Sequence, residues 1–178
     1  MKKKANVRMI TEGGMMIALS VLLSYIKIYT LPNGGSITAG SMIPLILFAI
    51  RWGVGPGIAV GACYGIIDFI LKPYFYHPLQ FLLDYPIAFG MLGLAGLGYF
   101  NNKNDGYARL SLGVALGIAG RAMSHVLSGV IFFAEYAGDQ NVWIYSIVYN
   151  LSYLLPELLI SLLVLVLVWR PMKASIVR

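Results

Sequence analysis

Long apolar runs constrain this sequence more than any other feature. A helix needs about 20 mostly apolar residues to cross a bilayer, and this 178-residue chain is 59% hydrophobic and only 11% charged. Turn-forming stretches such as LPNGG and NNKNDG separate the runs. We therefore expect an all-α membrane protein with six transmembrane helices in one domain, residues 1–178. The expected limits are Met9–Leu31, Ser36–Ile50, Gly53–Leu71, Pro78–Phe100, Ala108–Ala134 and Val142–Trp169.

The basic residues predict how the chain is oriented in the membrane. If the N-terminus is cytoplasmic, ten of the 13 Lys and Arg residues fall inside, which the positive-inside rule favours. Both termini are then cytoplasmic. The net charge of +6 indicates topology rather than nucleic-acid binding, because the basic residues gather at the ends of the runs. We expect no signal-peptide cleavage, since Lys27 interrupts the first run and no small-x-small site follows.

Polar and aromatic residues from three predicted spans share one depth. With a rise of 1.5 Å per residue, Asp84 lies roughly 9 Å below the outer end of its span, and His125 roughly 13 Å below the end of the next. Tyr85 follows Asp84, and Tyr145 and Asn150 fall in the first turns of the last span. This convergence predicts a cavity open to the outside. A carboxylate among aromatic rings favours a cationic ligand.

Each of these residues also has a purely structural interpretation. Asp84 could form an ion pair with Arg121 or Lys72, and His125 could bond a backbone carbonyl. Asn150 could join helices, and the tyrosines of the last span could form an interfacial belt. Phe133 near a span end could face lipid or pack against the protein.

Arg121 lies one turn before His125 and deeper in the membrane. A charge at that depth is costly unless it is paired. We therefore expect a carboxylate partner, with Asp68, Asp84 and Glu157 as open candidates.

Small residues four apart recur on three of the predicted spans. Such spacing lets helices approach closely. It predicts either packing within the chain or a docking face for another subunit. The pairs are Gly14 and Ala18, Gly57 and Gly61, and Gly113 and Gly117.

The sequence contains no motif for catalysis or cofactor binding. Neither a P-loop nor an H-E-x-x-H motif is present, and Cys63 is the single cysteine. His125 and Ser128 lie on one helix face, but nothing orients them as a catalytic pair. We expect no catalytic residue, no metal and no cofactor.

Four stretches are specific enough to indicate a family. They are GSITAGSMIPLILFAIRWGVGPG, HPLQFLLDYPIAFGMLGLAGL, SHVLSGVIFFAEYA and WIYSIVYNLSYLLPE, with MITEGGMMIAL near the start. Together they resemble the thiamine-specific S components of energy-coupling factor transporters.

The resemblance implies a fold, a function and partners. S components are six-helix proteins of the bacterial plasma membrane that bind a vitamin near the extracellular side and have no ATPase of their own. They dock on a membrane-embedded T component and two cytoplasmic ATPases, and topple to deliver the vitamin inward. Small residues on the first helix form the docking surface, which here implies Gly14 and Ala18.

The resemblance also implies a thiamine pocket. Asp84 would hold the aminopyrimidine or face the thiazolium, Phe133, His125 and Tyr145 would stack on the rings, and Asn150 would bond the pyrimidine edge. Some members carry Glu at the position of Asp84, Trp at that of Phe133, and a lid Trp in the loop that is LPNGGS here. The implied pocket residues are Tyr74, Asp84, Tyr85, His125, Gly129, Phe133, Tyr145 and Asn150.

Three other functions remain as alternatives. The chain could be a self-sufficient transporter or channel, although we find no internal repeat of the kind that many transporters contain. It could be a membrane enzyme, which the missing motifs disfavour. It could also bind a different vitamin.

Overall fold

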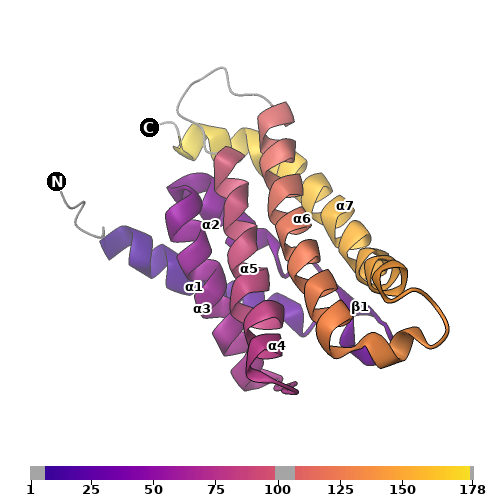
Figure 1. The fold of residues 1–178 in the computed structure, drawn as a ribbon. Coiled ribbons are helices and arrows are strands. Elements are labelled where there is room, and N and C mark those ends of the chain that lie inside the picture. The colour runs from indigo at the N-terminus through magenta and orange to yellow at the C-terminus, as the bar shows by residue number, and fades with distance from the viewer. Residues whose placement is uncertain (1–6, 99–106, 177–178) are drawn as a thin grey trace.

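A computed structural model describes residues 7–98 and 107–176 of the chain. In this part of the chain, helices account for nearly all of the fold, and they pack side by side in a bundle (Figure 1). Five segments are long and apolar enough to cross a membrane, and a sixth helix is shorter. The predicted all-helical, six-helix architecture is therefore confirmed. The six segments are α1 (Val7–Ser24), α2 (Ile43–Trp52), α3 (Val54–Leu71), the fourth span (Pro78–Gly98), α6 (Tyr107–Phe132) and α7 (Val142–Ile176).

The link between the first two helices corrects two predicted limits. The first span was expected to reach Leu31 and the second to begin at Ser36, but α1 ends at Ser24 and α2 begins at Ile43. Between them, antiparallel strands β1 (Lys27–Thr30) and β2 (Ser36–Thr38) form a hairpin. Asn33 and Gly34 have φ of 64° and 97° at its tip, a left-handed pair that suits Asn-Gly and turns the chain back.

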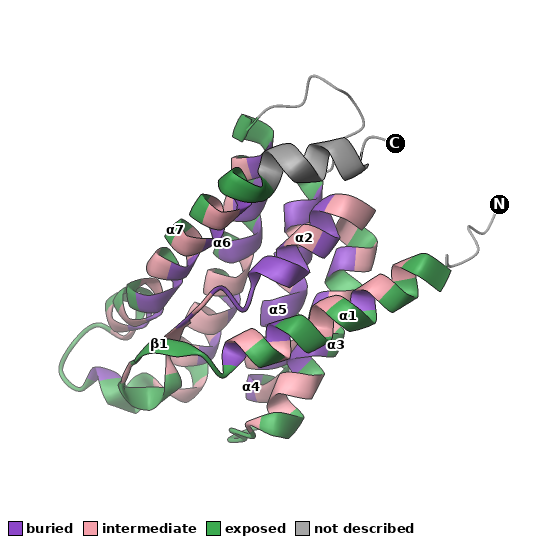
Figure 2. Ribbon diagram, turned by 180° about the vertical axis from the view of Figure 1, so that it is seen from behind, coloured by how far each residue is buried: buried purple, intermediate pink, exposed green. Residues whose placement is uncertain are grey.

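The short helix α2 is the centre of the bundle. Apart from Arg51 in its last turn it is apolar, as expected of a helix that is largely buried, and seven of its residues are buried. Figure 2 shows it above α1 as a mostly purple segment. Its length needs no match to the bilayer, because neighbouring helices rather than lipid cover it.

The fourth span is irregular. It consists of α4 (Pro78–Leu82), the π-helical turn η2 (Leu83–Ile87), α5 (Ala88–Met91) and the 3₁₀-helix η3 (Leu92–Gly98). Pro86 lies inside the π turn. Because proline has no backbone N–H to donate, it disturbs the regular ladder of hydrogen bonds at this point. Asp84 thus lies in the widened turn, and such turns are frequent at functional sites.

Glycines on α3 bring the backbone of the fourth span close. A Cβ added at Gly65 would lie 2.6 Å from the carbonyl carbon of Tyr85, and one at Gly57 would lie 3.0 Å from the Cα of Gly93. Gly61 meets the carbonyl group of Phe89 in the same way. Side chains at these positions would push the two segments apart, so the glycines fix where the π turn lies.

The two ends of the bundle differ in character. The hairpin, α4, the 3₁₀-helix η4 (Ala134–Ala137) and the start of α7 gather at the lower end of Figure 1, while α6 begins and α7 ends at the upper end. The other predicted limits fall within a few residues of the observed ones, although α7 continues seven residues past Trp169. Phe100 lies outside the described residues.

Candidate functional site

A cavity of about 680 Å³ opens among the hairpin, α3, the fourth span, α6 and α7. Its size falls in the range of small-molecule sites, which is roughly 300–1,000 Å³. The sequence-predicted pocket residues all contribute to its lining. They are Tyr74, Asp84, Tyr85, His125, Gly129, Phe133, Tyr145 and Asn150.

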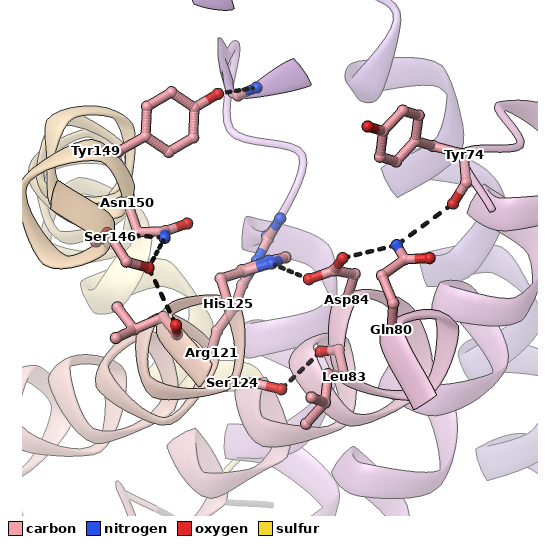
Figure 3. A network of polar contacts seen from close by, with 12 residues as sticks. Tyr74, Gln80, Leu83, Asp84, Arg121, Ser124, His125, Ser146, Tyr149 and Asn150 are labelled. Carbon is pink, nitrogen blue, oxygen red and sulfur yellow. Dashed lines mark hydrogen bonds and ion pairs between the residues drawn. The ribbon is translucent and has the colours of Figure 1, made fainter. Parts of the chain in front are cut away.

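Two side chains hold the carboxylate of Asp84. The amide of Gln80 donates to Oδ2 at 2.7 Å, and Nδ1 of His125 lies 3.1 Å from Oδ1 (Figure 3). Gln80 is fully buried. Its amide also donates to the carbonyl of Tyr74 and accepts the N–H of Tyr76. The amide therefore fixes Asp84 and the loop before α4 at the same time.

Arg121 determines the tautomer of His125. Its Nε donates to Nε2 of the imidazole at 3.2 Å, and a guanidinium can only donate. Nε2 must then be unprotonated, so the neutral ring carries its proton on Nδ1 and donates it to Asp84. The hydrogen bonds therefore run in one direction: Arg121 donates to His125, and His125 donates to Asp84.

The prediction that Arg121 pairs with a carboxylate is wrong. The described residues place no carboxylate in an ion pair with it, and its guanidinium carbon instead lies 4.2 Å from the ring centroid of Phe89. All three carboxylates proposed as partners nevertheless line the same cavity. The face of an aromatic ring attracts a positive charge, so Phe89 stabilises the guanidinium although no carboxylate pairs with it.

Charged side chains of both signs line the cavity in equal number. Asp68 pairs with Lys72 at 3.4 Å, and Lys72 also donates to Ser24 Oγ at 2.6 Å. The remaining four are spread over the hairpin and three helices. The six are Lys27, Asp68, Lys72, Asp84, Arg121 and Glu157.

Aromatic rings line two opposite sides of the cavity, with Tyr74 on one side and Tyr149 on the other (Figure 3). The ring centroid of Phe133 lies 5.9 Å from that of Tyr74 and 6.1 Å from that of Tyr136, with the second pair stacked. Tyr74 lies in the loop between α3 and α4, where partial burial and a hydrogen bond with Tyr136 raise the pKa of its phenol. On α7, the rings of Tyr145 and Tyr149 stack at 6.2 Å.

Two of the predicted residues are already engaged within the protein. Asn150 donates to the carbonyl of Ser146 at 2.9 Å and accepts from the hydroxyl of Tyr153 at 2.7 Å. The Tyr85 hydroxyl donates to the carbonyl of Lys72, and its ring packs against Phe69. Each therefore has a structural role in addition to its place in the lining.

Gly129 lies where α6 and α7 touch. A Cβ there would meet the hydroxyl of Ser146 and would lie 3.7 Å from the amide nitrogen of Asn150. The Ser146 hydroxyl donates to the carbonyl of Val126 at 3.0 Å (Figure 3). Glycine at this position lets the two helices close on one another beside the cavity.

The hairpin is fastened to α7 across the cavity. The hydroxyl of Tyr149 accepts the backbone N–H of Gly35 at 2.9 Å and donates to the carbonyl of Pro32 at 2.5 Å. Gly35 itself lies against the Tyr153 ring, because a Cβ there would approach that ring within 2.9 Å.

The comparisons with known proteins agree on one family. The profile described as "Thiamine transporter protein" matches residues 10–176 of the chain. The chain belongs to the thiamine transporter family. The thiamine transporter ThiT of Bacillus subtilis (strain 168) is 34% identical over 163 residues, which cover 85% of this chain and 84% of the relative. ThiT of Lacticaseibacillus paracasei is 32% identical over 165 residues, covering 84% and 81%.

A solved structure supports the fold. ThiT from Listeria monocytogenes matches with a TM-score of 0.82 at 23% identity, over 94% of this chain and 97% of that chain. The resemblance to thiamine-specific S components is thus confirmed at the level of family and fold. The chain is a multi-pass membrane protein of a transport family and not an enzyme.

Sequence reasoning missed several residues of the cavity. Gln80 carried a usable signal, because it precedes Asp84 by four residues on a helix, the spacing at which side chains meet. Tyr136 follows Phe133 closely enough to share its wall. The hairpin residues gave no such signal, since their contacts with α7 join segments more than 100 residues apart.

Proposed function

We propose that this chain is the thiamine-binding S component of an energy-coupling factor transporter. It binds thiamine in the cavity beside Asp84, near the extracellular side of the membrane. It docks on a membrane-embedded T component and two cytoplasmic ATPases, which supply the energy of transport, and it delivers thiamine inward. Both termini lie in the cytoplasm in this proposal.

One observation carries the proposal for the ligand. The eight residues singled out from the sequence come from four separate segments, and all eight line a single cavity. The cavity combines a hydrogen-bonded carboxylate with several aromatic rings. Thiamine matches this combination, because it joins a cationic thiazolium to a flat aminopyrimidine that can both donate and accept hydrogen bonds.

The residues have distinct roles in this proposal. Asp84 compensates the charge of the ligand and accepts its hydrogen bonds. Phe133, His125 and Tyr145 offer ring faces for stacking. The two N–H groups of Asn150 contact Ser146, but its amide oxygen keeps one lone pair beyond the bond from Tyr153, and this lone pair remains for a donor on the pyrimidine edge.

The first helix supports the proposed docking. Gly14 and Ala18 are exposed on α1, and no atom lies within 4 Å of a Cβ added at Gly14. The other spaced pairs pack inside the molecule: a Cβ at Gly117 would lie 3.1 Å from the carbonyl oxygen of Leu92, and Gly57 faces Ala49. Of the three pairs, the one on α1 is therefore available to a partner helix.

A titration tests the proposed function. The purified protein, without partner subunits, is titrated with thiamine by calorimetry, and pyridoxine and biotin serve as control vitamins. We expect saturable binding of one thiamine per chain and no heat from either control. Binding of another vitamin in place of thiamine would change the substrate, and no binding without partners would contradict a separate binding subunit.

A further inference from the structure

Glu157 on α7 has an asymmetric environment. It is only 3% exposed. Its Oε1 accepts two hydrogen bonds from Thr38 of the hairpin, from the backbone N–H at 2.5 Å and from the hydroxyl at 2.7 Å. Its Oε2 is buried and has no hydrogen-bond partner among the described residues. One oxygen is therefore satisfied and the other is not.

Such an arrangement is costly in isolation. A carboxylate oxygen can accept about two hydrogen bonds, and a buried charged group that lacks them is destabilising by several kcal/mol. Ser41 does not relieve the cost, because its hydroxyl lies 2.8 Å from the Thr38 hydroxyl and not at Oε2. Among the described residues Ser161, one turn further along α7, also has a buried hydroxyl without a partner, so it does not donate to Oε2 either, and Oε2 is open to a donor from outside the protein.

The position of Glu157 in the wall of the cavity makes a bound ligand the candidate donor. Glu157 lines the cavity that also contains Asp84. We propose that Glu157 is a second acidic ligand contact, whose Oε2 accepts a hydrogen bond from an N–H or O–H group of the bound cation. This inference rests on the proposed function, in which the ligand is thiamine. Thiamine has two such donors, the exocyclic amine of its pyrimidine and the terminal hydroxyl.

The contact of Oε1 with the hairpin gives the residue its orientation. Two donors on Thr38 hold Oε1, so the carboxylate cannot rotate freely and Oε2 keeps one direction. The carboxylate of Glu157 would then bind the ligand through Oε2 and the hairpin through Oε1. Binding would then strengthen the attachment of the hairpin, because both contacts favour the same position of Glu157.

The substitution Glu157→Gln separates the two oxygens. The carbonyl of Gln can still accept from both donors of Thr38, which places its NH₂ group where Oε2 was. A donor then faces a donor, so we expect thiamine to bind at least tenfold more weakly by calorimetry, with the melting temperature in detergent little changed. The matched control is Glu135→Gln, the same replacement at an exposed glutamate that does not line the cavity. It should weaken binding less than threefold.

Thiamine analogues identify which donor is involved. Oxythiamine carries a carbonyl in place of the amine, and a deoxy analogue lacks the hydroxyl. The analogue that lacks the donor to Oε2 should bind the wild type more weakly than thiamine does. For that analogue alone, Glu157→Gln and the wild type should have the same affinity. If the affinity for each analogue falls by the same factor in the wild type and in Glu157→Gln, Glu157 contacts neither group and the proposal is overturned.

An infrared measurement keeps the proposal testable if the variant does not fold. The chain contains three glutamates, Glu12, Glu135 and Glu157. In ¹³C-glutamate-labelled protein, binding of thiamine should shift one carboxylate band, and the shift should persist in Glu135→Gln. No shift in protein that binds thiamine would overturn the proposal.

The outcomes separate this inference from the proposed function. If wild type binds thiamine and Glu157→Gln binds it within twofold of wild type, the inference fails while the proposed function stands. If Glu135→Gln weakens binding as much as Glu157→Gln does, the loss does not come from Oε2 of Glu157, and the inference also fails. If wild type binds no thiamine, the proposed function itself is wrong.

Discussion

At the scale of the residue, Asp84 and its neighbour Gln80 act together at the cavity, because the Gln80 amide donates to the carboxylate. An ionisable group inside a membrane span is costly, so its presence indicates a functional or structural need. The neutral amide of Gln80 gave no such indication, although it is fully buried and orients Asp84. Its role depends on the carbonyl of Tyr74 and the N–H of Tyr76, which reach it only after the loop has folded.

Replacing Asp84 tests the proposed contact with the ligand. In Asp84→Asn an amide NH₂ group takes the place of one carboxylate oxygen, so both the charge and one acceptor are lost. A hydrogen bond to a charged group contributes about 1.5–3 kcal/mol, and we therefore expect thiamine affinity to fall by about 10- to 100-fold in calorimetry. The protein should remain folded.

The matched control for this variant is Asp139→Asn. Asp139 is exposed in the turn before α7 and does not line the cavity. Its replacement should leave the affinity unchanged. Equal affinities in Asp84→Asn and wild type would remove Asp84 from the binding site.

At the scale of elements, the apolar runs predicted the helices well and the hairpin poorly. The segment Lys27–Thr30 contains Ile28 and Tyr29, which continue the apolar run of α1. A short apolar run does not by itself distinguish strand from helix. Pairing with Ser36–Thr38 decides the outcome, and that pairing depends on the left-handed turn at Asn33 and Gly34. The π turn around Pro86 was likewise not predicted, since proline alone does not specify how a helix adjusts.

The close approach of α3 to the fourth span can be tested at Gly65. In Gly65→Ala the new methyl group would lie 2.6 Å from the carbonyl carbon of Tyr85. Because the obstacle is backbone, the helices must separate, and overpacking of this kind costs about 1–3 kcal/mol. We expect a lower melting temperature in detergent and weaker thiamine binding, since the same shift moves Asp84.

Gly55→Ala on the same helix provides the control for Gly65→Ala. No atom lies within 4 Å of a Cβ at Gly55, and alanine favours a helix over glycine by up to about 1 kcal/mol. Its melting temperature should equal or exceed that of wild type. If both variants melt alike, the packing described for Gly65 is wrong.

The attachment of the hairpin can be tested at Tyr149. Tyr149→Phe removes the hydroxyl that contacts Gly35 and Pro32 and keeps the ring that stacks on Tyr145. Each hydrogen bond contributes about 0.5–1.5 kcal/mol net, so we expect thiamine to dissociate about tenfold faster in stopped-flow displacement. Tyr107→Phe, at an exposed position on α6, should not alter the rate. An unchanged rate in Tyr149→Phe would show that the hairpin does not control release.

At the scale of the whole molecule, family membership follows from the sequence, but the use of the small-residue pairs does not. The spacing of Gly14 and Ala18 is the same as that of Gly113 and Gly117, so spacing alone cannot tell an internal contact from an external one. The fold separates them, because η3 lies against Gly113 while α1 turns Gly14 outward. Neighbouring Gly13, and not Gly14, packs against Val60 and Phe48.

Bulky substitutions on α1 test the proposed docking. In Gly14→Leu or Ala18→Leu a large side chain would prevent close contact with a partner helix while leaving the cavity unchanged. We expect the rate of thiamine uptake by cells with the complete transporter to fall to background, and thiamine affinity of the purified subunit to stay within twofold of wild type. Cys63→Leu, at an exposed position on α3, should preserve both. Normal uptake in the α1 variants would exclude this face as the docking surface.

The equal number of acidic and basic side chains around the cavity has an electrical consequence. With all six side chains ionised, the empty cavity carries no net formal charge, whereas in the proposed function a cavity that holds thiamine carries one positive charge. Moving one elementary charge across a membrane potential of 100 mV corresponds to about 2.3 kcal/mol. In the proposed cycle, a potential that is negative inside the cell therefore assists the inward movement of the loaded subunit and does not oppose the return of the empty one.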